Sequence, residues 1–180
     1  MKNHLKFMPL LALLLSIAAS AAWAQSNTGT TTVSVTVGAE ASLTVASPTP
    51  LTAVGSVFNS YTGSTVVTYF VRTTQTTGSG SITLKVTTDF SPANGPSVAT
   101  PPTAGDALKY TCTAAAPATA CSGTQTALTT GTTPVATFGA DAHTTTSGGS
   151  TVTNSWTLTN DPVYKTGTYN ATVTYTISAA

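Results

Sequence analysis

Apolar and polar residues alternate most regularly along the last fourteen residues of the chain. From Thr168 to Ser178 every second residue is polar, and each residue between them is apolar or aromatic. Side chains on a β-strand point alternately to the two faces of a sheet, so this pattern predicts a strand with one buried face. Because the strand runs almost to the C-terminus, where most domains fray, we expect it to do more than fill a core. The residues expected on its buried face are Tyr169, Ala171, Val173, Tyr175 and Ile177.

Shorter segments with the same period of two recur upstream, separated by turn-forming Gly, Pro and Asn. Trp156 lies on an apolar strand face and is expected in the core rather than on a sugar-binding platform. A turn at residues 160–162 is expected to lead into a final hairpin. Eight or nine short strands without a helix predict an antiparallel two-sheet sandwich of the immunoglobulin-like kind. The predicted strands cover residues 31–37, 41–46, 51–58, 64–74, 81–88, 107–113, 133–138, 151–159 and 167–178.

The N-terminus has the features of a secretory signal peptide. Lys2 and Lys6 precede an apolar run over residues 7–19, and Ala22-Trp23-Ala24 is a small-x-small cleavage site. We therefore expect a signal peptide at residues 1–24, an N-terminal extension at 25–38 and a sandwich domain at 39–180. The apolar run is shorter than the roughly 20 residues that span a bilayer, so we expect export without membrane insertion.

Charged residues are scarce, and threonine takes their place. Removing Lys2 and Lys6 with the signal peptide changes the formal net charge from +1 to −1 and leaves nine charged side chains. Without a basic patch, nucleic acid is not an expected partner. Threonine occurs 42 times and mostly alternates with apolar residues, which favours folded strands over a disordered or O-glycosylated stalk. Low charge also permits association between copies of the chain.

The two cysteines, Cys112 and Cys121, are expected to form a disulfide, which is the usual state of a cysteine pair in an exported protein. Their spacing differs from the Cys-x-x-Cys spacing of redox-active pairs, so a structural role is expected.

Nothing in the sequence points to catalysis or to a cofactor. His143 is the only histidine after the signal peptide, and Asp141 lies two residues before it in a polar loop. No Gly-x-Ser-x-Gly elbow, zinc-type spacing or EF-hand-type spacing is present. A solvated loop histidine is the favoured interpretation, and we expect no enzyme activity, cofactor or metal site of a recognisable type. The sequence leaves two questions open: whether backbone carbonyls form a calcium site, and whether Asn170 is glycosylated.

The predicted strand at residues 31–37 has neither Lys nor Pro, which usually protect edge strands. Val33, Val35 and Val37 would share one face. Such a segment can fold back onto its own sheet, or it can add to the sheet of a neighbouring copy. Donation from each copy to the next is head-to-tail, and a head-to-tail contact that does not close produces a filament.

The C-terminal pattern resembles that of chaperone–usher pilins and the related spore coat protein U-like secreted proteins. Gly167 lies fourteen residues from the terminus, alternating apolar residues follow, and Gly167–Tyr169 is similar to the start of the last strand of the coat-protein type. Two features depart from the family: Ala179 replaces a penultimate aromatic, and the cysteines lie in the second half of the domain. The resemblance implies an incomplete immunoglobulin-like fold, an N-terminal donor strand, and assembly with a periplasmic chaperone and an outer-membrane secretion pore.

These observations predict a secreted structural subunit of a bacterial surface fibre or coat, exported through the periplasm. The alternative is a monomeric binding module, such as an adhesin or carbohydrate-binding domain. That alternative predicts an N-terminal strand paired within its own chain and exposed aromatic residues near Trp156, Tyr164 or Tyr61. A third possibility, a secreted hydrolase, requires His143 and an acid to converge in a cleft.

Overall fold

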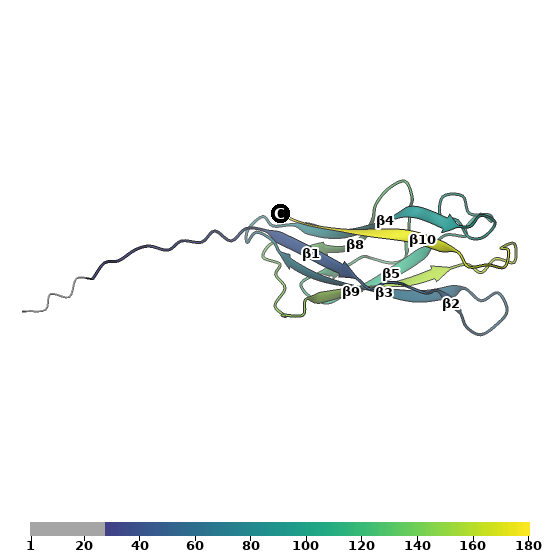
Figure 1. Cartoon of the computed structure of the whole chain (residues 1–180), viewed down its shortest axis with the longest axis horizontal. Coiled ribbons are helices and arrows are strands. Elements are labelled where there is room, and N and C mark those ends of the chain that lie inside the picture. Colours follow the sequence, from purple (N-terminus) through teal and green to yellow (C-terminus); the bar gives the residue numbers. More distant parts are fainter. Residues whose placement is uncertain (1–27) are drawn as a thin grey trace, which may run out of the picture. The chain divides into compact units, whose positions relative to one another are not determined.

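The computed structural model describes residues 28–180, and within that range every regular element is a β-strand. The strands form two antiparallel sheets that pack as a sandwich (Figure 1), which confirms the predicted fold class. A compact unit runs from Thr36 to Ala180. The signal peptide predicted for residues 1–24 lies outside the described residues.

The first sheet has six strands, and its centre is formed by the long strands β3 and β9. Its order is β1 (Glu40–Val45), β3 (Tyr61–Arg72), β9 (Ser150–Leu158), β5 (Lys109–Ala114) and β7 (Gln125–Thr126), and β2 (Thr52–Ala53) also pairs with β3. The second sheet has four strands, in the order β10 (Asn170–Ala179), β4 (Gly80–Ser91), β8 (Thr133–Phe138) and β6 (Thr119–Ala120).

The core lies between the sheets and is built by alternation along β3, β9 and the first half of β4, together with β8, in which Val135 and Ala136 are both buried. The largest fully buried side chains include Tyr69, Tyr110, Ile82 and Leu84. Trp156 is buried as predicted; its ring centroid lies 5.1 Å from that of Tyr110, and its indole nitrogen donates a hydrogen bond to the hydroxyl of a buried threonine. Inward apolar side chains therefore join the two layers, while threonines cover much of the outer faces.

Three of the predicted elements differ in the structure. Only Thr52–Ala53 of the predicted strand at 51–58 is paired, since positive φ angles at Gly55 (101°) and Phe58 (59°) turn the backbone away from β3. The predicted last hairpin is instead a crossover, because β9 and β10 belong to different sheets. The predicted strand at 31–37 is not formed, since residues 28–39 have no ladder partner in the described chain.

The two ends of the sandwich differ in what they carry. We call one the tail end; it holds Gly38, the turn after Arg72, His143 and the C-terminal Ala180. The Thr74 amide donates a backbone hydrogen bond to the Ala180 carbonyl, and the Arg72 guanidinium donates to the Gly38 carbonyl. We call the other the loop end; it holds the loops at residues 54–60, 92–108 and 159–169, which extend beyond the strands in Figure 1.

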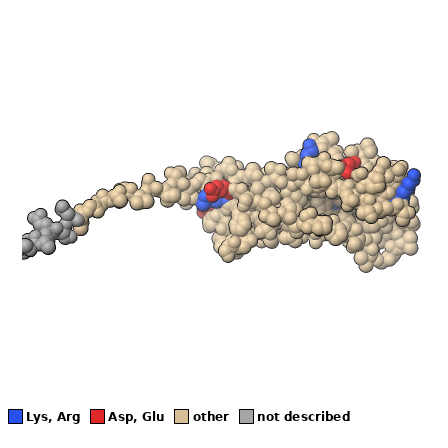
Figure 2. All heavy atoms as spheres, viewed as in Figure 1, with Lys and Arg blue, Asp and Glu red and all other residues tan. Residues whose placement is uncertain are grey.

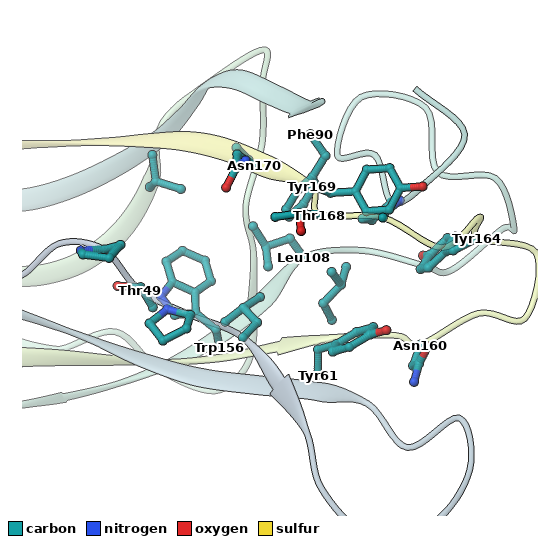
Figure 3. A pocket seen from close by; sticks show the side chains of 18 of the residues that line it. Thr49, Tyr61, Phe90, Leu108, Trp156, Asn160, Tyr164, Thr168, Tyr169 and Asn170 are labelled. Carbon is teal, nitrogen blue, oxygen red and sulfur yellow. The ribbon is translucent and has the colours of Figure 1, made fainter. Parts of the chain in front are cut away.

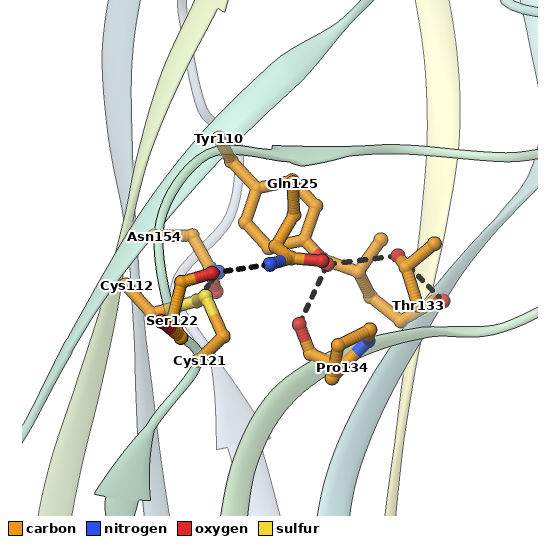
Figure 4. Close-up of a disulfide and its surroundings, with 9 residues drawn as sticks. Tyr110, Cys112, Cys121, Ser122, Gln125, Thr133, Pro134 and Asn154 are labelled. Carbon is orange, nitrogen blue, oxygen red and sulfur yellow. Dashed lines mark hydrogen bonds between the residues drawn. A yellow bond between two sulfur atoms is a disulfide. The ribbon is translucent and has the colours of Figure 1, made fainter.

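The predicted disulfide between Cys112 and Cys121 is present and connects the two layers (Figure 4). Cys112 lies on β5 of the six-stranded sheet, whereas Cys121 follows β6 of the four-stranded sheet. The Cys121 amide donates a 2.9 Å hydrogen bond to the carbonyl of Val135 on β8. The disulfide therefore closes one long side of the sandwich.

Replacing both cysteines with serine should lower the free energy of unfolding by about 2.5–3 kcal/mol, because a loop of about ten residues is no longer closed in the unfolded chain. Urea unfolding of the double variant beside the unsubstituted chain measures this loss. A loss below about 1 kcal/mol would contradict the role of the disulfide as a brace between the layers.

Candidate functional site: a groove along an open edge

The long side opposite the disulfide is bounded by β1 of one sheet and β10 of the other. Within residues 28–180, β10 pairs only with β4, so the backbone groups along its other edge have no strand partner. This ten-residue strand contains neither proline nor a charged residue, the usual protections of an exposed edge. In contrast, β6 and β7 on the disulfide side are two residues long. Among the described strands on this side, the outer edges of β1 and β10 both lack a strand partner, and β10 offers the longer edge for an added strand.

A groove with a volume of about 980 Å³ lies beside the first half of β10 (Figure 3). One wall is formed by β10 and the residues before it, and the other by residues 45–51. Leu108, Trp156 and Leu158 from the first sheet and Phe90 from the second also line it. The groove therefore leads from the free edge of β10 toward the core between the sheets.

The groove exists because the edge of the first sheet is interrupted between β1 and β2. After the Ala46 amide donates to the Val66 carbonyl, no further ladder bond forms until β2. Pro48 and Pro50 lack amide donors and cannot continue the ladder. A Cβ on Gly63 would lie 2.4 Å from the Pro50 carbonyl oxygen, so this chain segment rests directly against the β3 backbone. The interruption leaves space between this segment and β10.

The side chains predicted on the buried face of β10 point inward, but they are incompletely covered. All five, including Tyr169 just before the strand, are only half-buried, whereas the inward apolar residues of β3 and β4 are nearly inaccessible. Tyr169, Ala171, Val173 and Tyr175 line the groove, and Ile177 lies beyond it. These five side chains thus share the inward face, and only the first four of them line the groove.

Tyr175 combines a buried hydroxyl with a lack of hydrogen-bond partners. Its hydroxyl has no partner among the described residues, whereas that of Tyr110 donates to Thr133 or to the Pro134 carbonyl, each at 2.8 Å. Burial raises the pKa of both phenols above the usual value of 10.0. Because the pKa of each phenol is higher in the folded chain, ionisation opposes folding: the stability of the fold does not depend on these groups' titration below pH 10 and falls as pH rises beyond it.

The N-terminal segment predicted to donate a strand is exposed. Val33, Val35 and Val37 have exposed fractions of 90%, 84% and 61%, the first two being among the highest of the large apolar residues. The segment carries the predicted alternation but is not paired within the described chain.

Aromatic side chains from the loop end surround the mouth of the groove. Figure 3 shows Tyr61, Tyr164 and Tyr169 around it, all half-buried. Tyr164 donates a 3.0 Å hydrogen bond to Asp106, and Tyr169 donates a 2.6 Å bond to the Lys165 carbonyl. These bonds fix the ring positions, so the mouth has a defined shape.

Two carboxylates hold the loops around this mouth. Partial burial alone would raise the pKa of Asp89, but hydrogen bonds from Ser97, Val98, Ala99 and Phe90 lower it below the usual value of 3.8. Hydrogen bonds from Thr103 and from the backbone amide of Val163 likewise lower the pKa of Asp161. The sequence placed both acids beside turns but gave no sign of their partners.

His143 lies at the tail end, far from the groove lining. Its Nδ1 is 2.8 Å from the Asp141 carbonyl oxygen and 3.8 Å from the Asp141 carboxylate. Both side chains are mostly exposed beside a second hollow of about 460 Å³. Among the described hydrogen bonds, the only partner of the imidazole is the Asp141 carbonyl.

The described residues contain no group of three or more His, Cys, Asp or Glu side chains placed to hold a metal ion. No helix within residues 28–180 has the length and apolar character needed to cross a membrane.

Comparisons with protein-family models, with curated proteins and with solved structures found no match for this chain.

Replacing Tyr175 with phenylalanine should leave the free energy of unfolding unchanged or raise it by up to about 1 kcal/mol, because a buried hydroxyl without partners is removed. Tyr110→Phe is the matched control and should lose about 1 kcal/mol with its hydrogen bond. Both are measured by urea unfolding of a chain that begins at Gly38. Equal losses in the two variants would show that the Tyr175 hydroxyl is hydrogen-bonded.

Proposed function

We propose that this protein is a secreted structural subunit of a bacterial surface fibre or coat, and that its copies assemble by β-strand addition. Residues 31–37 of one copy would lie in the groove of the next and pair with the free edge of β10. The observation that carries the proposal is the half-buried apolar face of β10 beside an edge without a partner strand. The exposed, alternating N-terminal segment supplies a matching strand from the same chain.

The spacing of the valines matches that of the groove. Val33 to Val37 and Ala171 to Tyr175 are both four-residue intervals, which span about 13–14 Å on a strand. In an antiparallel arrangement Val37 faces Ala171, Val35 faces Val173, and Val33 faces Tyr175. The donor then runs toward the loop end, where the groove has its mouth, and continues there into its own domain.

Burial of the valines provides the driving force. Each covered valine side chain contributes roughly 1.5–3 kcal/mol relative to its exposed state, and the exposed fractions of Val33 and Val35 are 90% and 84%. The same strand supplies amides and carbonyls to the β10 edge, so it satisfies backbone groups as well as covering apolar surface. Figure 2 shows how few charged side chains this face of the molecule carries, so association meets little charge repulsion.

Donation in one direction makes the contact head-to-tail, and a joined pair retains one free groove on one copy and one free donor strand on the other. Such an assembly grows as a filament unless it closes into a ring. The partners that follow are other copies of the chain, together with the periplasmic chaperone and outer-membrane pore that the family resemblance implies.

Val35→Asp in the chain starting at Gln25 should abolish multimers while the fold stays intact, because the groove would have to bury an unpaired carboxylate. Ser34→Asp is the matched control; it adds the same charge on the opposite face of the donor and should retain multimers. Light scattering measures the mass, and circular dichroism checks the fold. Multimers of unchanged mass in Val35→Asp would contradict strand addition.

The aromatic mouth of the groove favours one alternative, a binding module for a carbohydrate or another ligand with flat apolar faces. Tyr61, Tyr164 and Tyr169 would supply stacking surfaces, and Asn160 and Asn170 lie close by (Figure 3). This alternative predicts a monomer that binds an oligosaccharide and loses at least tenfold in affinity in Tyr61→Ala, a difference of about 1.4 kcal/mol. Titration against a glycan panel measures it; failure of every glycan to bind would remove this alternative.

A further inference from the structure

Large exposed apolar residues gather at the loop end of the sandwich. We call the set formed by Val54, Val57, Phe58 and Val163 the apolar loop patch. Its exposed fractions run from 56% for Phe58 to 86% for Val57. Val57 and Phe58 also line the groove mouth, whereas Val54 and Val163 do not. Nothing within the described chain covers these four side chains.

We propose that the apolar loop patch is a second interface between consecutive subunits and packs against the tail end of the copy that donates the strand. This inference rests on the proposed strand donation and adds a contact between folded domains to it. The occupant is a second copy of the chain, and its position follows from the length of the connection between donor strand and domain.

That connection is short because the domain begins almost where the donor strand ends. Glu40 is already paired with Arg72 as the first residue of β1. The Arg72 guanidinium also holds the Gly38 carbonyl at 2.7 Å and the Glu40 carboxylate at 2.6 Å, although both bonds are exposed. From Val37 in the neighbouring groove to Glu40 there are three residue steps, which span at most about 10–11 Å.

A connection this short leaves no room for a solvent-filled gap between domains. With Val37 opposite Ala171 at the start of the neighbour's β10, the donating copy must place its tail end directly at the neighbour's loop end. The loops that carry the patch extend beyond the strands on that side (Figure 1), so they meet the approaching domain first.

The surface that the patch meets has a suitable shape. The tail end has a second hollow, of about 460 Å³. Because Val37 would lie in the neighbour's groove, the hollow is then bounded by its other lining residues, which include Gly38, Arg72 and Asp141. Covering the apolar loop patch there removes it from water, which a free monomer does not achieve. The patch contributes the apolar side of this contact, whereas the hollow contributes the polar and charged side chains of Arg72, Asp141 and His143.

The double variant Val54→Ser, Val163→Ser tests this interface separately from the groove, because neither residue lines the groove. Multimers of the double variant should dissociate at a concentration at least roughly tenfold higher than those of the unsubstituted chain, since about 1.4 kcal/mol corresponds to a factor of ten. Val66→Thr, on the outer face of β3, is the control and should leave the multimers unchanged. Sedimentation equilibrium measures the dissociation.

A synthetic peptide of residues 28–37, which carries no domain, separates the two proposals. It should bind the chain that begins at Gly38 with the same affinity whether or not the two valines are replaced. Equal peptide binding together with equally stable multimers would overturn the second interface and leave strand addition standing. Failure of the peptide to bind the unsubstituted chain would overturn strand addition and this interface with it.

Discussion

The free backbone edge of β10 is the constraint on which the remaining features depend. A strand in the middle of a sheet satisfies its amides and carbonyls on both sides, but β10 has a partner strand on one side only within the described chain. The apolar face of the same strand is only half-buried. Pro48 and Pro50 prevent the opposite edge from closing over it. One added strand would pair with the free backbone edge and also cover the apolar face. The groove and the strand edge are therefore best understood as a single site.

The two long sides of the sandwich differ in structure: one is closed and the other is partly open. On one side the Cys112–Cys121 disulfide and the short strands β6 and β7 close the gap between the layers. On the other, β1 and β10 are left apart at the loop end. Bracing one side covalently allows the other to stay open without loss of the fold, because the core around Tyr69, Ile82 and Leu84 is already complete. Threonine supports this arrangement, since its hydroxyl keeps the outer faces polar without adding charge.

Much of the fold could be predicted from the period of two, because long strands alternate between a buried and a polar face. The β8 bounds were predicted at both ends, and the face of β10 was correct. The pattern failed at residues 51–58, where positive φ angles at Gly55 and Phe58 override it, and at 160–162, where local turn residues cannot show which sheet the next strand joins. Only one wall of the groove, the C-terminal strand, was predicted, because residues 45–51 of the other wall have no regular pattern. The aromatic mouth depends on loops held by Asp89 and Asp161 through individual side-chain hydrogen bonds, which leave no periodic pattern in the sequence. The bond from Thr103 to Asp161 also joins residues that are 58 positions apart.

The most direct measurement is disulfide trapping between two copies that carry different cysteines. One chain carries Val35→Cys and the other Val173→Cys, and the two are mixed under mild oxidation. Residues directly opposite each other in neighbouring strands have Cα atoms about 4.5–5.5 Å apart, within reach of a disulfide. Strand addition predicts a cross-linked pair that contains one copy of each chain, and no pair when Val35→Cys is replaced by Ser34→Cys. Absence of the mixed pair, or equal yield with Ser34→Cys, would contradict the account.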